Sequence, residues 1–288
     1  MDYSEYTDSS TEVAEKLVTV SDGVSLRVID FRPENDSDER PVLLFVAGWI
    51  STIAGWKDVL RVVTPCFRTI YFESREKSSS VIPKGEKVSY AVERLSLDLK
   101  EVVEQMVPEK RNFVMAGSSL GATVIMEYLS MKLRQPECSI LVSPLPEFRF
   151  PKLLAAIILN LVHPSFYFAV KPVVKWYLRN FRLDPVNEQE QVRKYEYTLD
   201  MADPYKLKAN AKAVMNYSIW DRISDIPSPI LIIGASTDAL HETDTQKRMM
   251  DLFRKSEYME LESNKETHSK KAGEIMVDYI ENRKYTLI

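Results

Sequence analysis

The sequence is poor in cysteine and glycine, and it has no long apolar run. Cys66 and Cys138 are the only cysteines among 288 residues, which excludes a disulfide framework and is typical of a reducing compartment. The longest largely apolar stretch, residues 153–162, is too short to cross a bilayer, so we expect no transmembrane helix. Because the chain has only eight glycines, a motif that needs two of them has little chance of arising by accident.

The chain also lacks an excess of either charge and a basic leader. Its formal net charge is −4, and no run of Lys and Arg is dense enough to track phosphates, which argues against nucleic-acid binding. The first twenty residues are acidic and polar, without the basic start and apolar centre of a secretory signal, so we expect a cytoplasmic protein. The 45% of hydrophobic residues is enough for a sizeable folded core.

Short apolar runs alternate with helical patterns along most of the chain. The runs predict strands at 16–20, 25–31, 42–46, 69–72, 113–116, 139–142, 230–233 and 258–261. A helical stripe of apolar residues between Val92 and Met106 turns Glu93, Asp98 and Lys100 away from the core. The alternation predicts an α/β protein with a mostly parallel sheet, helices on both faces, and a ligand site beyond the carboxyl ends of the strands.

The alternation is interrupted between residues 144 and 220, where the pattern is helical only and rich in aromatic residues. We interpret residues 144–220 as a helical cap inserted into a core formed by residues 1–143 and 221–288. Apolar side chains of this segment, Phe166 and Trp176 among them, are candidates for a pocket that binds an acyl chain, although packing between cap helices explains such residues equally well.

The segment Gly117-Ser118-Ser119-Leu120-Gly121 lies between a predicted strand and a predicted helix. This is the order of a nucleophile elbow, in which glycines two residues before and after a serine permit a turn tight enough to expose its hydroxyl. Ser118 lacks that spacing of glycines. The alternative is a glycine turn in which Ser119 only caps the helix. The pattern favours Ser119 as the nucleophile.

A serine nucleophile needs a histidine that accepts its proton. The chain has three candidates, His163, His241 and His268. His268 follows the last predicted strand and precedes the terminal helix, which suits a base on a loop at the carboxyl edge of the sheet. His163 belongs to the predicted cap, and His241 is close in sequence to the predicted acid. We therefore expect His268 to be the base.

Two acids are candidates for orienting that histidine. Asp238 follows the predicted strand 230–233, which gives the chain order serine, acid, histidine. Asp244 is the alternative, and either residue could instead cap the helix that begins near Thr245. We expect Asp238 to be the third residue of the triad.

Attack on a carbonyl needs two N–H groups that stabilise the negative charge on its oxygen. Leu120 directly follows the predicted nucleophile, and its N–H is one candidate. The loop Ala47-Gly48-Trp49-Ile50 follows the predicted strand 42–46, and Trp49 N–H is the other candidate. Gly48 permits close approach, and we expect Gly48 and Ile50 to contact substrate. Gly48 could instead simply turn the chain, and Trp49 could be a core aromatic.

These residues resemble the α/β-hydrolase superfamily, in particular its serine esterase and lipase branch. The resemblance implies an eight-stranded sheet of order 1-2-4-3-5-6-7-8 with a cap after the sixth strand. Residues 73–79 are similar to the Asp-x-Arg-Gly-x-Gly-x-Ser loop of that branch, but the acid is Glu73 and the glycines are missing. Ala47 stands where many relatives have His, so the hydrogen bonds around this loop must differ. In this layout Cys66 and Cys138 lie roughly 14 Å apart, too far for a disulfide, so we predict free thiols.

The reaction that these residues predict is hydrolysis of a carboxylic ester, with a medium-chain or lipid-like acyl group, through an acyl-enzyme. No metal and no organic cofactor is required, and the expected partner is a small acyl substrate. An acyltransferase or thioesterase would use the same triad, and a non-catalytic ligand-binding protein could use the same scaffold. The sequence leaves the oligomeric state open.

Overall fold

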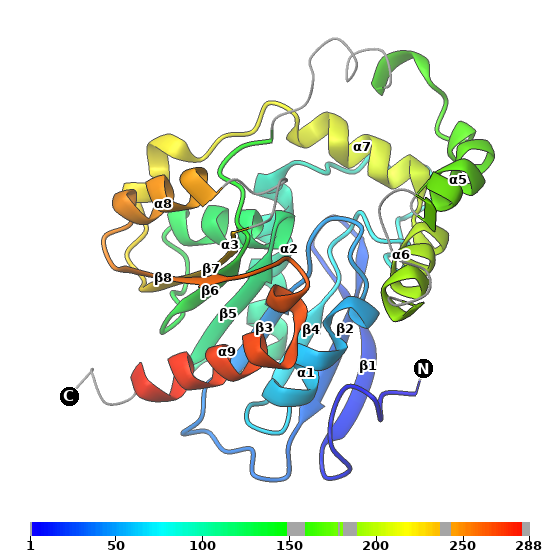
Figure 1. The fold of residues 1–288 in the computed structure, drawn as a ribbon. Helices are drawn as coiled ribbons and strands as arrows, with labels where there is room; N and C mark the ends of the chain where they lie inside the picture. The colour runs from blue at the N-terminus through cyan, green and yellow to red at the C-terminus, as the bar shows by residue number, and fades with distance from the viewer. Residues whose placement is uncertain (1, 149–158, 178, 181–188, 237–242, 284–288) are drawn as a thin grey trace.

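A computed structural model describes residues 2–148, 159–177, 179–180, 189–236 and 243–283 (Figure 1). Eight strands form one sheet of order β1-β2-β4-β3-β5-β6-β7-β8, which confirms the predicted topology. The strands are β1 (Glu12–Thr19), β2 (Ser25–Arg32), β3 (Val42–Val46), β4 (Thr69–Phe72), β5 (Phe113–Ser118), β6 (Ser139–Val142), β7 (Ile230–Ala235) and β8 (Ser256–Leu261).

The direction of the strands determines where loops can meet. β1 and β2 form an antiparallel hairpin, and β2 is antiparallel to β4. From β4 across to β8 every neighbouring pair is parallel. The loops that follow β3, β5, β7 and β8 therefore leave the sheet at the same edge, where ligands bind in open α/β sheets.

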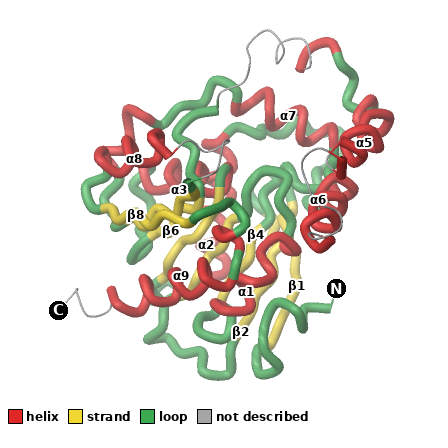
Figure 2. The backbone as a smooth tube through the Cα atoms, viewed as in Figure 1, coloured by secondary structure: helices red, strands yellow, loops and turns green. Residues whose placement is uncertain are grey.

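Helices cover both faces of the sheet (Figure 2). The apolar clusters place α1 (Lys57–Val63) and α9 (Lys270–Arg283) on one face, and α2 (Val92–Met106), α3 (Leu120–Ser130) and α8 (Thr243–Leu252) on the other. Because both faces are covered, every residue of β3, β5, β6 and β7 is buried, as their unbroken apolar runs predict.

The prediction for the polar side of α2 is wrong at one residue. The stripe from Val92 to Met106 is buried as expected, and Glu93 is exposed. Asp98, however, is fully buried, because its carboxylate is paired with Arg75 from the segment that follows β4. The helical period alone cannot distinguish a carboxylate that faces water from one that meets a buried guanidinium.

The described part of the region between β6 and β7 is helical. It contains α5 (Phe166–Tyr177), α6 (Gln189–Met201) and α7 (Pro204–Val214), which lie beyond the carboxyl edge of the sheet in Figure 1. An isolated antiparallel bridge joins Glu147 to Ser218, and Ile219 N–H donates to the Pro146 carbonyl at 2.9 Å. The residues where the chain leaves the sheet after β6 are thus paired with the residues where it returns before β7.

Two further observations concern the chain as a whole. Cys66 and Cys138 are free thiols, as predicted. None of the helices within the described ranges is long and apolar enough to span a bilayer.

Candidate active site

Ser119 occupies a tight turn between the end of β5 and the start of α3. Its backbone has φ 48° and ψ −118°, a conformation that residues with a side chain rarely adopt, and its N–H donates to the Val142 carbonyl at 3.0 Å. Strain of this kind persists only where the surroundings enforce it. We call residues 117–121 the elbow.

The two glycines of the elbow are required by close backbone contacts. A Cβ atom on Gly121 would lie 2.2 Å from the Val46 carbonyl oxygen at the end of β3. A Cβ atom on Gly117 would lie 2.7 Å from Ile125 Cδ1 and 3.0 Å from the Gly121 carbonyl carbon. At Gly121 the clash is with backbone that cannot move aside, so this position requires glycine. At Gly117 the Ile125 side chain and the backbone would have to shift, so any larger residue there strains the elbow.

The loop after β3 lies directly against the elbow. A Cβ atom on Gly48 would be 3.3 Å from Ser119 Cβ. The loop closes as a turn in which Ser51 N–H donates to the Gly48 carbonyl at 3.1 Å, with Ile50 at φ 62°. A β-branched residue in the left-handed region costs roughly 1–2 kcal/mol, so this turn too is held by its surroundings.

Two backbone N–H groups at this junction are the candidates predicted from the sequence for the oxyanion hole, those of Leu120 and Trp49. Leu120 is the first residue of α3, and the first N–H groups of a helix have no acceptor inside it. Trp49 N–H donates to no acceptor among the described residues. The Gly48 carbonyl and the Trp49 N–H belong to the same peptide unit, and in a trans peptide these two groups point in opposite directions. Because the carbonyl points into the turn, towards Ser51 N–H, the Trp49 N–H points out of it.

Residues 73–80, which we call the charged loop, bring a buried lysine to the same turn. Lys77 is 7% exposed, and its Nζ donates to the Gly48 carbonyl oxygen. The fully buried Glu76 places Oε1 3.2 Å from Lys77 Nζ. The sequence does not show that Glu76 and Lys77 are buried, because a segment rich in Ser and Lys has the composition of a loop exposed to solvent.

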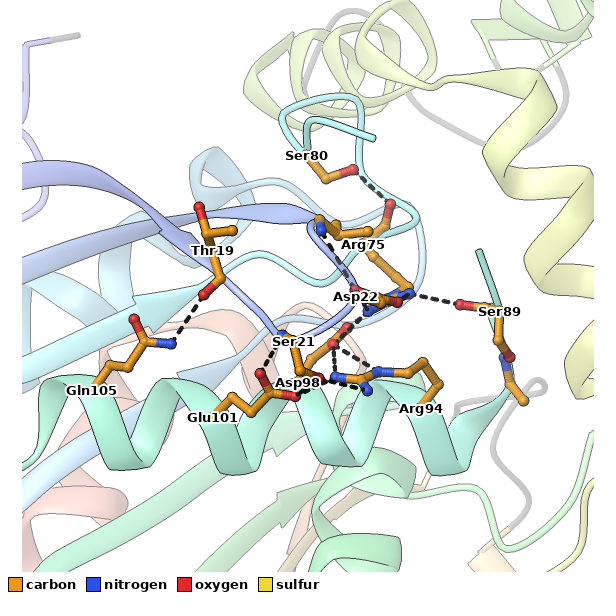
Figure 3. Close-up of polar contacts among 12 residues, drawn as sticks. Thr19, Ser21, Asp22, Arg75, Ser80, Ser89, Arg94, Asp98, Glu101 and Gln105 are labelled. Carbon is orange, nitrogen blue, oxygen red and sulfur yellow. Dashed lines mark hydrogen bonds and ion pairs between the residues drawn. The ribbon is translucent and has the colours of Figure 1, made fainter. Parts of the chain in front are cut away.

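Arg75 anchors the charged loop in the core (Figure 3). Its side chain is fully buried and donates to Asp98 on α2 at 2.5 and 2.6 Å, and to Asp22 at 2.7 and 3.2 Å. Burial alone lowers the pKa of Arg75, but the hydrogen bonds and charges of Asp98 and Asp22 outweigh it, so the net pKa is raised and the guanidinium stays charged. Arg94, one turn before Asp98 on α2, donates to the same carboxylate at 2.8 Å.

His268 ends a short 3₁₀ helix, η4 (Glu266–His268), between β8 and α9. Its Nδ1 lies 3.0 Å from the Asn264 carbonyl oxygen and 3.0 Å from Thr267 Oγ1. A carbonyl oxygen only accepts, so this contact requires the proton on Nδ1 and leaves Nε2 as the basic nitrogen.

Side-chain contacts connect His268 with the loop after β3. Its ring packs on Trp56 of η1 (Ile53–Trp56) with centroids 4.1 Å apart. Trp56 Nε1 donates to Ser51 Oγ at 3.1 Å, and Ser51 belongs to the turn that contains Gly48. His268, Gly48 and Ser119 are therefore linked through one continuous set of contacts at the carboxyl edge.

The remaining candidates lie elsewhere or outside the described residues. Asp238 and His241 fall in residues 237–242, which lie outside them. Asp244 is exposed in the first turn of α8, and His163 is only partly covered just before α5, with Nδ1 2.7 Å from Ser165 Oγ. The choice of Asp238 over Asp244 stays a prediction.

The predicted acyl-binding aromatics lie on the outer helices. Phe166 and Trp176 on α5 are 58% and 57% exposed. A cavity of about 50 Å³ lies between the turn after β3 and helices α6 and α7. Its walls include Ile50, Thr52 and Lys77 on one side and Tyr197, Met201 and Leu207 on the other. Within the described ranges, no group of three or more His, Cys, Asp or Glu could hold a metal ion.

Comparisons with known proteins agree with this architecture. A family model described as serine aminopeptidase, S33, matches residues 78–263, well over half of the chain. No curated protein sequence matches.

Several solved structures that resemble the chain are hydrolases. They include a carboxylesterase of Nitrososphaera gargenis (TM-score 0.74, 14% identity, 94% of this chain and 100% of that one). An esterase from Exiguobacterium antarcticum has TM-score 0.72 and 16% identity, over 93% of this chain and 100% of that one. A hydrolase from Pseudomonas aeruginosa PA01 has TM-score 0.68 and 20% identity, over 86% and 89% of the two chains. At these identities the likeness establishes the fold.

Proposed function

Because the chain belongs to the serine aminopeptidase S33 family of α/β-hydrolases, we propose that it is a serine hydrolase that cleaves carboxylic esters through an acyl-enzyme on Ser119. His268 is the base, Asp238 orients it, and the N–H groups of Trp49 and Leu120 bind the oxyanion. The observation that carries the proposal is the strained backbone of Ser119, φ 48°, at the carboxyl end of the central strand β5 with Gly48 packed against it.

The reaction proceeds in two half-steps. His268 Nε2 accepts the Ser119 proton as the serine oxygen attacks the carbonyl, and the two backbone N–H groups stabilise the charge on the carbonyl oxygen. The protonated histidine then gives its proton to the leaving alcohol. Water, deprotonated by the same histidine, releases the acid and restores Ser119. The Nδ1 contact with the Asn264 carbonyl supports this role, because it leaves Nε2 basic.

Residues 144–220 form a cap over this site in our proposal, with the core made of residues 1–143 and 221–288. The support is the cavity between the turn after β3 and helices α6 and α7, where Ile50 faces Met201 and Leu207. The lining of this cavity is mixed, because Glu76 and Lys77 also form part of it. The medium-chain or lipid-like acyl group is instead inferred from exposed apolar side chains of the cap, Phe166 and Trp176 among them, which would form an acyl-binding surface along α5.

A labelling experiment with a fluorophosphonate tests the nucleophile. Wild type should be labelled at Ser119, whereas Ser119→Ala and His268→Ala should lose at least about 10⁴-fold in activity. Ser118→Ala is the matched control, since Ser118 is the neighbouring buried serine, and it should stay within about fivefold of wild type. A folded wild type that never reacts would instead identify a binding protein on this scaffold.

A substrate series separates the remaining possibilities. p-Nitrophenyl esters of increasing chain length should be cleaved, with the longer chains preferred. A sharp preference for acetate contradicts the acyl-pocket part of the proposal. Cleavage of amino-acid p-nitroanilides in preference to esters contradicts the ester, while Ser119 keeps its role. Transfer of the acyl group to added alcohols or thiols at the expense of hydrolysis indicates an acyltransferase.

A further inference from the structure

The hydrogen bond between Lys77 and the Gly48 carbonyl joins the charged loop to the peptide unit that carries the Trp49 N–H. That peptide has two ends with different neighbours. Its carbonyl oxygen accepts from Lys77 Nζ and from Ser51 N–H, which fills both lone pairs. Its N–H donates to no described acceptor. The plane of the peptide is therefore fixed entirely from the carbonyl side.

We propose that Lys77 is a positioning residue for the oxyanion hole: its ammonium group orients and polarises the Gly48–Trp49 peptide so that the Trp49 N–H is aimed at the developing charge. This inference rests on the proposed function, because it assigns the Trp49 N–H to the oxyanion. Lys77 acts through the peptide and touches no reacting atom.

The charge of Lys77 matters as well as its contact. A charged donor makes a stronger hydrogen bond than a neutral one, and hydrogen bonds along a chain polarise one another by roughly 10–30% per bond. An ammonium group on the carbonyl oxygen therefore makes the N–H of the same peptide a better donor. The hydrogen bonds to the Gly48 carbonyl also help to hold the turn in which Ile50 keeps its unfavourable φ of 62°.

Lys77 is itself held in place from two directions. Glu76 supplies the counter-charge at 3.2 Å, and Ser74 Oγ donates to the same Glu76 oxygen at 2.7 Å. Ser80 Oγ donates to the Lys77 carbonyl at 3.0 Å, and to the Arg75 carbonyl at 2.7 Å. The anchored Arg75 thus fixes the backbone from which Lys77 reaches Gly48.

A second lysine provides a matched control. Lys206 of α7 donates to the Lys77 and Ser80 carbonyls at 3.0 and 2.7 Å, so it holds the same charged loop without reaching Gly48. Lys77→Met and Lys206→Met each remove one ammonium group from this loop. A purely structural role predicts similar effects of the two substitutions, whereas a role in positioning the peptide predicts different ones.

The test measures kcat and KM for a p-nitrophenyl ester, the rate of fluorophosphonate labelling, and thermal stability. Lys77→Met should lower kcat and the labelling rate about 10- to 100-fold with KM nearly unchanged, less than the 10²–10³-fold loss of a whole oxyanion donor. Lys77→Gln, which keeps a neutral donor, should recover part of the loss. Lys206→Met should stay within about threefold of wild type in kcat at a comparable loss of stability.

Equal losses of kcat in Lys77→Met and Lys206→Met, or a Lys77→Met enzyme as fast as wild type, would overturn the inference. The proposed function fails separately, if wild type and Ser119→Ala are both unreactive. In that case the amide ¹⁵N chemical shift of Trp49 still tests whether Lys77 polarises the Gly48–Trp49 peptide. Lys77→Met must move this resonance and Lys206→Met must leave it in place; the opposite result rules out the positioning role.

Discussion

The elbow and the charged loop lie on opposite sides of the turn after β3, and different forces hold them. The elbow is fixed by close packing of Gly117 and Gly121 against the backbone at the end of β3. The charged loop is fixed by buried ion pairs, in which Arg75 joins Asp98 and Asp22. Both supports join segments that are distant in sequence, but the elbow leaves a local signal in the spacing of its two glycines, whereas the ion pairs join residues 23 and 53 positions apart without any local pattern. The first kind of support is therefore visible in a single sequence and the second is not.

The largest effect is expected at the elbow. Gly121→Ala places a methyl group 2.2 Å from a backbone oxygen of β3, which cannot move aside like a side chain. We expect a loss of about 4 kcal/mol or more in the free energy of unfolding, above the usual 1–3 kcal/mol of overpacking, together with loss of labelling. Urea unfolding measures it. As a control, Gly85→Ala meets no atom within 4 Å and should cost only about 1 kcal/mol, for its φ of 82°.

The next effect should come from the charged loop. Arg75→Met leaves the buried Asp98 carboxylate with Arg94 as its remaining partner, and we expect a loss of about 3 kcal/mol, at the low end for a broken buried pair. A double-mutant cycle by urea unfolding checks the cause. Arg75→Met with Asp98→Asn should cost clearly less than the sum of the single changes. Additive costs would mean that the pair is not the support we describe.

A smaller effect should distinguish the two regions by its pH dependence. Burial raises the pKa of Asp22, but hydrogen bonds and charge from Arg75 outweigh it, so its folded pKa lies below the ordinary 3.8. The stability that Asp22 contributes is then complete above that value and is lost as pH falls through the folded pKa. Asp22→Asn should cost about 1 kcal/mol at neutral pH, since Asp22 is partly exposed, and progressively less below pH 3.8.

The elbow supplies the control for that experiment. Gly117→Ala adds a methyl group and no titratable group, so its cost in urea unfolding should not change over the same pH range. A cost of Asp22→Asn that stays constant with pH, like that of Gly117→Ala, would count against electrostatic support of the charged loop.

The smallest effect is expected at an ion pair on the surface. Lys100 and Glu104 on α2 lie 2.9 Å apart, with 33% and 56% of their side chains exposed. Lys100→Met should change the free energy of unfolding by no more than about 0.5 kcal/mol, because solvent screens the pair. Thermal or urea unfolding of the variant checks this. A loss as large as that of Arg75→Met would show that burial is not what makes the charged loop important.

The sheet was predictable from sequence because its central strands are covered on both faces. The run 42–46 coincides with β3, and 139–142 with β6. β5 and β7 extend two residues beyond their predicted ends, because Gly117 and Ser118 still pair with β6, as Gly234 and Ala235 pair with β8. At the edge of the sheet, β1 begins at Glu12, four residues before its predicted start, because its charged residues face water and give no apolar signal.

The candidate site was predictable only where local chemistry marks it. The spacing of Gly117 and Gly121 predicts the tight turn at Ser119, which the structure shows, whereas the catalytic roles of Ser119 and His268 stay predictions. Nothing near Lys77 shows that it meets a carbonyl 29 residues earlier, and nothing near Asp98 shows that it meets Arg75. Such contacts are decided by the crossover connections of the sheet, which bring distant segments together only after folding.

The bridge between Glu147 and Ser218 limits how much the stability of the protein depends on the length of the chain between these residues. Tyr217 donates to Glu127 of α3 at 2.6 Å, so the returning chain is fastened to the core at the same place. When both ends of a segment are tied by the core itself, each doubling of the length between them costs only about 0.6 kcal/mol. Changes in the length of the chain between these two points therefore cost the sheet little stability.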